Sequence, residues 1–183
     1  LRFYIGGLPD VALRLHELLM GACVGVLVGA PGRGGDATRQ FLAPASVSPA
    51  GYGDHEAMLP VTLRGLAGTR LMQEYFAFAP RFLFVDIENL GPAFARCPGN
   101  ACEIAVLFNR HVSTLEGAVE PDNFLLHCAP AINLFERRAD RLHLDDGASS
   151  FHVIPERTAS ADYEVFDIRS VTGHLDDGRS EER

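Results

Sequence analysis

The most informative part of this sequence is Gly68-Thr-Arg-Leu-Met-Gln-Glu-Tyr-Phe-Ala-Phe-Ala-Pro-Arg-Phe-Leu-Phe-Val-Asp-Ile-Glu-Asn-Leu90. From Thr69 to Phe78, apolar residues recur at helical spacing, and Pro80 ends the predicted helix because proline cannot donate a backbone hydrogen bond. From Phe82 to Glu88 the pattern changes to strand alternation, with one wholly apolar face. We therefore predict a helix that leads directly into a strand.

Upstream of this stretch, the sequence predicts a short amphipathic helix over residues 11–19, with Asp10 as its N-cap. A mostly buried strand is predicted from Cys23 to Val28. The glycine-rich segment from Gly29 to Gln40 is typical of a surface loop. Residues 41–59 are rich in proline, glycine, alanine and serine, so we expect irregular chain there, with a short strand or turn near 46–48.

Downstream, Cys102 to Asn109 predicts another strand. Only the polar stretch 91–101 separates it from the strand at 82–88, so we expect these two strands to form an antiparallel unit. Residues 122–127 predict one helical turn. A clean alternation predicts a last strand from Tyr163 to Ile168, and further strand-like segments are expected at 131–135, 141–144 and 151–154.

These elements predict an α+β fold that is rich in strands, with mixed or antiparallel sheets and a few short helices. We expect a central helix and strand subdomain over 1–110, a strand-rich second subdomain over 111–172, and an acidic, poorly ordered tail over 173–183. Because Leu1 opens in what looks like the middle of a strand, we interpret the chain as a fragment of a larger multidomain protein.

Composition excludes several classes of protein. With 183 residues, of which 47% are hydrophobic, the chain can bury one substantial core or two small ones. Its apolar runs are shorter than the roughly 20 residues of a membrane-spanning helix, so we expect no direct membrane insertion. The net charge of -8 is the wrong sign for binding a phosphate backbone, so we expect no nucleic acid. The four cysteines predict reduced thiols in a reducing compartment.

Two sets of residues could carry chemistry. Asp86 and Glu88 share a strand face, as a carboxylate pair for acid/base or metal work would. Zinc could be held by soft ligands from a second set, namely Cys97, Cys102, His111, His127 and Cys128. Neither set has the full spacing of a known site, so we expect no enzyme, no cofactor and no metal. A metal-dependent hydrolase, or a zinc-binding module that uses these residues, stays open as the alternative.

Aromatic residues gather where the predicted helix meets the predicted strand, at Tyr75, Phe76, Phe78, Phe82 and Phe84. Apolar residues at regular spacing usually face a domain core, and any that point outward would anchor a partner. In a later block, Asn133 and Phe135 are further candidates for either role. These seven residues are the site candidates that the sequence offers.

The stretch 68–90 closely resembles a hallmark of the TssF family, also called ImpG or VasA, of type VI secretion baseplate proteins. A second block, Asp122-Asn-Phe-Leu-Leu-His-Cys-Ala-Pro-Ala-Ile-Asn-Leu-Phe-Glu136, resembles the other signature of that family. The opening Leu1-Arg-Phe-Tyr-Ile-Gly-Gly and the residues from Val47 to Pro60 fit as well. Known members are considerably longer, so the resemblance implies a central-to-C-terminal portion of such a protein.

The resemblance also implies a function. TssF proteins are non-enzymatic structural components of the baseplate wedge, needed for assembly of a contractile, phage-tail-like machine for protein secretion. It implies TssG, TssK, TssE and other baseplate subunits as partners, with self-association as a further option. The implied location is the cytoplasm of a Gram-negative bacterium, at the baseplate docked on the inner membrane.

Overall fold

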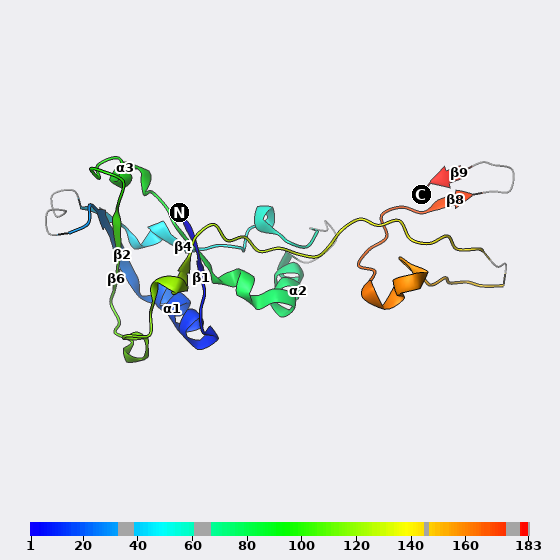
Figure 1. Ribbon diagram of the computed structural model, residues 1–183, viewed down its shortest axis with the longest axis horizontal. Helices are drawn as coiled ribbons and strands as arrows, with labels where there is room; N and C mark the ends of the chain where they lie inside the picture. Colours follow the sequence, from blue (N-terminus) through cyan, green and yellow to red (C-terminus); the bar gives the residue numbers. More distant parts are fainter. Residues whose placement is uncertain (33–38, 61–66, 145–146, 175–179, 183) are drawn as a thin grey trace. The chain divides into compact units, whose positions relative to one another are not determined.

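The structure is a computed structural model that describes residues 1–32, 39–60, 67–144, 147–174 and 180–182. Two compact units make up the chain, a first unit from Leu1 to Ile132 and a second unit from Asn133 to Arg183 (Figure 1). The first unit carries the two larger sheets and the helices α1, α2 and α3. No helix in these ranges has the length and apolar character that a membrane span requires.

The first sheet is antiparallel and has the order β4-β5-β1-β7. Strand β1 lies inside it and pairs with β5, so that Phe3 faces Val85 in register. The amino group of Leu1 extends this pairing by donating to the carbonyl of Ile87 at 2.8 Å. The strand bounds are β1 (Arg2–Ile5), β4 (Val47–Pro49), β5 (Phe84–Ile87) and β7 (Phe124–Leu125).

The second sheet has the order β3-β2-β6 and is also antiparallel, and its strands are β2 (Cys23–Gly29), β3 (Gln40–Leu42) and β6 (Glu103–Phe108). Val26 and Val28 of the central strand are fully buried. At Gly25 the register with β6 shifts, and a Cβ atom there would lie 2.2 Å from the ring of Phe41. This close approach explains why glycine interrupts an otherwise apolar strand.

Helix α1 (Pro9–Ala22) provides much of the core of the first unit. Ala12, Leu15 and Leu19 pack with Ile5 and Val85, which ties the helix to the first sheet. A separate cluster joins the buried side chains of the second sheet to β5 and α3 (Gly91–Phe94). Phe3, Val47 and Val106 pack against both clusters, so the two sheets share one apolar interior.

The predicted N-cap of this helix is wrong. Leu8 occupies the N-cap position and Pro9 the first turn, where the missing N–H of proline costs no helical hydrogen bond. Asp10 lies inside the helix and pairs instead with Arg14, one turn on, at 3.0 Å. The strand predicted at 23–28 is confirmed, as are the helix at 69–78 and the short strand near 46–48.

The predicted antiparallel unit of 82–88 and 102–109 is also wrong. Both segments contain strands, but β5 pairs with β1 and β4, whereas β6 pairs with β2 in the other sheet. The connection between them contains α3. Strands from earlier in the sequence lie beside each of them, namely β1 and β4 beside β5, and β2 beside β6. The helical turn predicted at 122–127 is limited to the end of the 3-10 turn η6 (Pro121–Asn123), and β7 follows it directly within this range.

A buried asparagine holds the segment around η6 to the start of the chain. Asn123 donates from Nδ2 to the carbonyl of Gly6 at 2.8 Å and accepts at Oδ1 from the N–H of Glu120 at 2.7 Å. Leu115, in the 3-10 turn η5 (Ser113–Leu115), packs on α1 in the same region. The first unit therefore continues past residue 110 to Ile132.

The second unit contains the 3-10 segment η7 (Arg157–Asp162) and an antiparallel pair, β8 (Thr172–His174) with β9 (Ser180–Glu182). Within the described residues, the segments 131–135, 141–144, 151–154 and 163–168 are not strands, so these predictions are wrong. Alternation alone does not make a strand, because a strand also needs a paired neighbour and a surface to bury it. Of the tail expected from 173 onward, residues 175–179 and 183 lie outside the described ranges.

Candidate protein-protein interface

Helix α2 (Ala67–Phe78) buries charged residues and exposes apolar ones, which is the reverse of an ordinary surface helix. Arg70 and Glu74, one turn apart, are only 9% and 3% exposed, whereas Met72, Tyr75 and Phe76 are 62%, 54% and 79% exposed. A surface helix usually buries its apolar stripe and presents its charges to water. The first unit therefore covers the charged face of α2 and leaves its aromatic face open.

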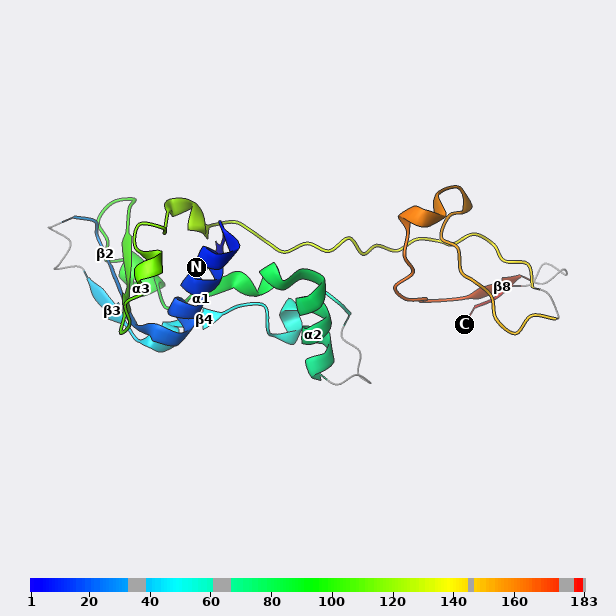
Figure 2. The same cartoon turned by 90° about the horizontal axis from the view of Figure 1, so that it is seen from below.

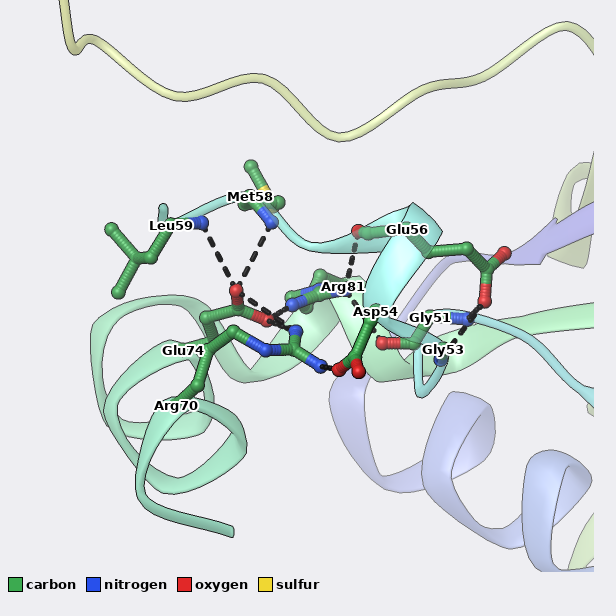
Figure 3. Close-up of polar contacts among 9 residues, drawn as sticks. All are labelled: Gly51, Gly53, Asp54, Glu56, Met58, Leu59, Arg70, Glu74 and Arg81. Carbon is green, nitrogen blue, oxygen red and sulfur yellow. Dashed lines mark hydrogen bonds and ion pairs between the residues drawn. The ribbon is translucent and has the colours of Figure 1, made fainter. Parts of the chain in front are cut away.

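Buried charge holds α2 against the segment 51–59, which contains the 3-10 turn η3 (Asp54–Glu56); both views show this segment beside α2 (Figures 1 and 2). Figure 3 shows the carboxylate of Glu74 between the guanidinium groups of Arg70 and Arg81. The Oε1 atom of Glu74 also accepts from the N–H groups of Met58 and Leu59, both at 3.0 Å. This carboxylate thus links the helix to Arg81, in the 3-10 segment that follows it (Ala79–Leu83), and to the loop that precedes it.

Arg81 is the most deeply buried member of this network, at 1% exposure. Its Nη2 atom donates to the carbonyl of Gly51 at 2.6 Å and to that of Glu56 at 3.0 Å. Burial, followed by the neighbouring charge of Arg70, lowers the pKa of Arg81, but a guanidinium stays protonated in proteins. A buried charge of this kind requires a partner of opposite charge, and Glu74 supplies it.

Gly51 is needed where Arg81 meets the loop. Its φ angle is +94°, a conformation that side chains other than glycine rarely adopt. A Cβ atom at this position would also lie 3.2 Å from the carbonyl oxygen of Arg81. Glycine therefore allows the loop to approach the buried arginine closely.

The open face of α2 forms one side of an apolar hollow of about 370 Å³, lined by Tyr52, Leu71, Met72, Tyr75, Phe76 and Phe82. None of these lining side chains is charged. The rings of Tyr52 and Tyr75 lie 5.0 and 6.1 Å from that of Phe82, and the guanidinium of Arg81 stacks 4.8 Å from the same ring. The buried charge network thus also fixes an aromatic ring of the hollow. We call these six residues the aromatic surface.

The structure divides the site residues predicted from the sequence. Tyr75, Phe76 and Phe78 are exposed, whereas Phe82 and Phe84 are buried, the latter with its ring 4.9 Å from that of Tyr4. In the second unit, Asn133 and Phe135 are exposed, and the ring of Phe135 lies 6.3 Å from that of Tyr163.

Sequence reasoning missed the residues that make the site, above all Arg70, Glu74, Arg81 and Tyr52. One signal was available, because Arg70, Glu74 and Arg81 are the only charged residues between Gly68 and Val85. Two of them stand one helical turn apart, on the stripe that the structure buries.

The carboxylate pair proposed for acid/base or metal chemistry is not assembled. Asp86 accepts from Nε and Nη2 of Arg2 at 2.8 and 2.6 Å, and this hydrogen-bonded ion pair lowers the pKa of the carboxyl group. Glu88 lies exposed beyond the end of β5. In the described ranges, no three histidine, cysteine, aspartate or glutamate side chains are grouped to hold a metal ion.

The ion pairs of Arg2 predict how the stability of the first unit depends on pH. Arg2 also pairs with Glu56 at 2.7 Å. Burial alone would raise the pKa of Glu56, but the hydrogen bond from the N–H of Gly51 and the charge of Arg2 outweigh burial, so this pKa is lowered. Carboxyl groups with a lowered pKa stabilise the fold above their ordinary pKa near 4 and lose that contribution as the pH falls through the lowered value. We therefore expect Asp86→Asn to reduce the loss of stability between about pH 5 and pH 3.

The measurement is the urea midpoint of the Asp86→Asn variant and of the wild type across this pH range. Because Arg2 is nearly half exposed, the difference between the two curves should stay below about 1 kcal/mol. Parallel curves would show that Asp86 is not a determinant of acid stability.

Comparison with known proteins identifies relatives over nearly the whole chain. The family model "Type VI secretion system, TssF" matches residues 1–183. The type VI secretion system component TssF1 of Pseudomonas aeruginosa is 42% identical over 174 residues, which cover 95% of this chain and 28% of that protein. A chain in the cryo-electron microscopy structure of the TssK-TssF-TssG baseplate subcomplex superposes with a TM-score of 0.68 and 25% identity. That match covers 98% of this chain and 33% of the other, so the chain spans about a third of its relatives or less.

Proposed function

This chain belongs to the TssF family of type VI secretion system proteins, and we propose that it is a non-enzymatic structural part of the baseplate whose aromatic surface docks against another subunit. One observation carries this proposal, namely that α2 buries its charges and exposes its aromatic residues. Exposing apolar side chains to water is unfavourable, and a bound partner that covered them would remove this cost.

The chemistry of the aromatic surface defines the kind of partner. Aromatic side chains are enriched among the residues that contribute most to binding between proteins. Tyr75 and Phe76 stand at the rim of a hollow without charged lining residues, so the complementary group is an apolar side chain of the partner. A charged or strongly hydrated ligand would gain nothing there, because it would lose its hydration without a compensating contact.

A relative that adopts this fold has been solved in a subcomplex with TssK and TssG. This supports TssG and TssK as the subunits that meet this chain in the assembled baseplate. TssE and self-association stay predictions from the family resemblance, as does a cytoplasmic location at the membrane-docked baseplate.

The second unit supports a role in assembly by a separate observation. None of the residues 133–144 and 147–174 is buried, although many are large and apolar, including Phe135, Leu144, Phe166 and Ile168. A segment that buries none of these apolar side chains has no hydrophobic core to stabilise it. We propose that other parts of the baseplate cover it, with Phe135 as one of the anchors.

The test uses the full-length parent protein, mixed with TssG and TssK and separated by size exclusion. We expect co-elution, together with slower hydrogen exchange in peptides of α2 and of residues 133–144 in the complex. Peptides of β2 are the internal control, since Val26 and Val28 are already fully buried. Failure of the full-length protein to co-elute would contradict the baseplate role, and co-elution without protection of α2 would contradict the aromatic surface as the contact.

A further inference from the structure

Two of the four cysteines lie in contact. The Sγ atoms of Cys97 and Cys102 are 3.1 Å apart, although five positions separate the residues in sequence. Both side chains are partly exposed, so a small reagent can reach them. The other two cysteines lie against backbone oxygens instead, with Cys23 Sγ 3.7 Å from the carbonyl of Gly25 and Cys128 Sγ 3.6 Å from that of Leu126.

The fold brings this pair together through a short turn. Cys97 closes the turn after α3, where its N–H donates to the carbonyl of Phe94 at 3.1 Å. Gly99, with a φ angle of +95°, reverses the chain between the two cysteines, and nothing lies within 4 Å of the place where its Cβ would stand. The Sγ atom of Cys102 then donates to the carbonyl of Gly29, at the end of β2, at 3.2 Å.

We propose that Cys97 and Cys102 form a thiol-disulfide exchange site that closes to an intramolecular disulfide by reaction with a small disulfide such as oxidised glutathione. A disulfide needs its sulfur atoms about 2.0 Å apart, so the observed pair has to approach by only about 1 Å. The connecting residues 98–101 are all exposed, so this turn can adjust without disturbing the core.

The exchange balances in two steps. The Cys97 thiolate attacks one sulfur of oxidised glutathione, which forms a mixed disulfide and releases one glutathione thiolate. The glutathione thiolate released in this step takes the proton of Cys102, whose sulfur then attacks the Cys97 sulfur, forms the internal bond and releases the second glutathione as a thiolate. Burial, together with the contact to Cys97, raises the pKa of the Cys102 thiol, which favours Cys97 as the first nucleophile.

The bond would lie where the connection from α3 enters β6. Glu103, the next residue after Cys102, pairs with Gly29 at the start of β6. Oxidation would therefore tie the turn after α3 to the residue that immediately precedes β6, an edge strand of the second sheet. Reduced glutathione in excess returns the pair to two thiols, so the site responds to the ratio of oxidised to reduced glutathione.

The sequence makes the test direct. Arg96 and Arg110 bracket both cysteines, so trypsin releases them together in the peptide Cys97–Arg110. We expect that full-length protein treated with oxidised glutathione, alkylated and digested gives this peptide without alkyl groups and two hydrogen atoms lighter. Prior treatment with a reductant should restore two alkyl groups.

The Cys102→Ser variant tests the order of the steps. Without its second thiol, Cys97 should stop at the glutathione adduct, whereas Cys128→Ser should leave the internal bond unchanged. Two alkyl groups on the oxidised wild-type peptide would overturn the proposal. A stable glutathione adduct on that peptide would also overturn it, because the neighbouring thiol would then have failed to close the bond.

Discussion

Replacing Glu74 with alanine is expected to lower the free energy of local unfolding of α2 by about 3–5 kcal/mol, the usual cost of breaking a buried ion pair. The change would leave Arg81 at 1% exposure with no carboxylate beside it. It would also remove the acceptor for the N–H groups of Met58 and Leu59. Hydrogen exchange of α2 amides in the full-length protein measures this free energy.

A matched control is available in the same unit. Asp10 and Arg14 form an ion pair with the same spacing as Arg70 and Glu74, but on the exposed side of α1. Asp10→Ala should therefore change the local stability of α1 by no more than about 0.5 kcal/mol. If Glu74→Ala were as mild as Asp10→Ala, the network would not be what holds α2 in place.

Local patterns in the sequence were sufficient where one segment determines its own structure. The helix at 69–78 and a strand after it follow from spacing and from Pro80, and the structure has both, although the strand begins at Phe84, because the 3-10 segment Ala79–Leu83 comes between them. Pairing between distant segments could not be predicted in this way. The partners of β5 and β6 depend on β1, β2 and β4, and no local pattern specifies which of several apolar strands takes which edge.

The candidate site shows the same limit at the level of side chains. Regular apolar spacing in Tyr75, Phe76 and Phe78 favoured a buried face, but the structure buries Arg70 and Glu74 instead. Helical spacing defines the stripes of a helix without defining which stripe turns inward. Here the choice depends on Arg81 and on the N–H groups of Met58 and Leu59, which come from outside the helix.

In the second unit, alternation at 163–168 predicted a strand that the structure lacks. The exposed apolar residues Phe166 and Ile168 would be accounted for if this segment faces other proteins. Both cases have one physical origin. A sequence reports that a residue is apolar, but not whether its own chain or a neighbour covers it.

The Phe76→Asp substitution is expected to weaken binding of the full-length protein to a complex of TssG and TssK by about 30-fold or more, the effect of losing an aromatic hot spot of at least 2 kcal/mol. Phe76 is 79% exposed and makes its ring contact with Tyr75, centroids 5.6 Å apart, on the open face of α2. The variant should therefore keep the stability of the free protein while losing affinity. Titration by interferometry gives the dissociation constant, and thermal unfolding of the free variant checks the fold.

Leu13→Asp is the control that makes this result specific. Leu13 is 60% exposed on α1, so it matches Phe76 in being a large apolar residue on the surface of a helix in the same unit. It lies outside the aromatic surface. An equal loss of affinity in both variants would point to a general effect of added negative charge, on a chain that already carries -8. Loss of affinity in Phe76→Asp alone would identify α2 as the contact.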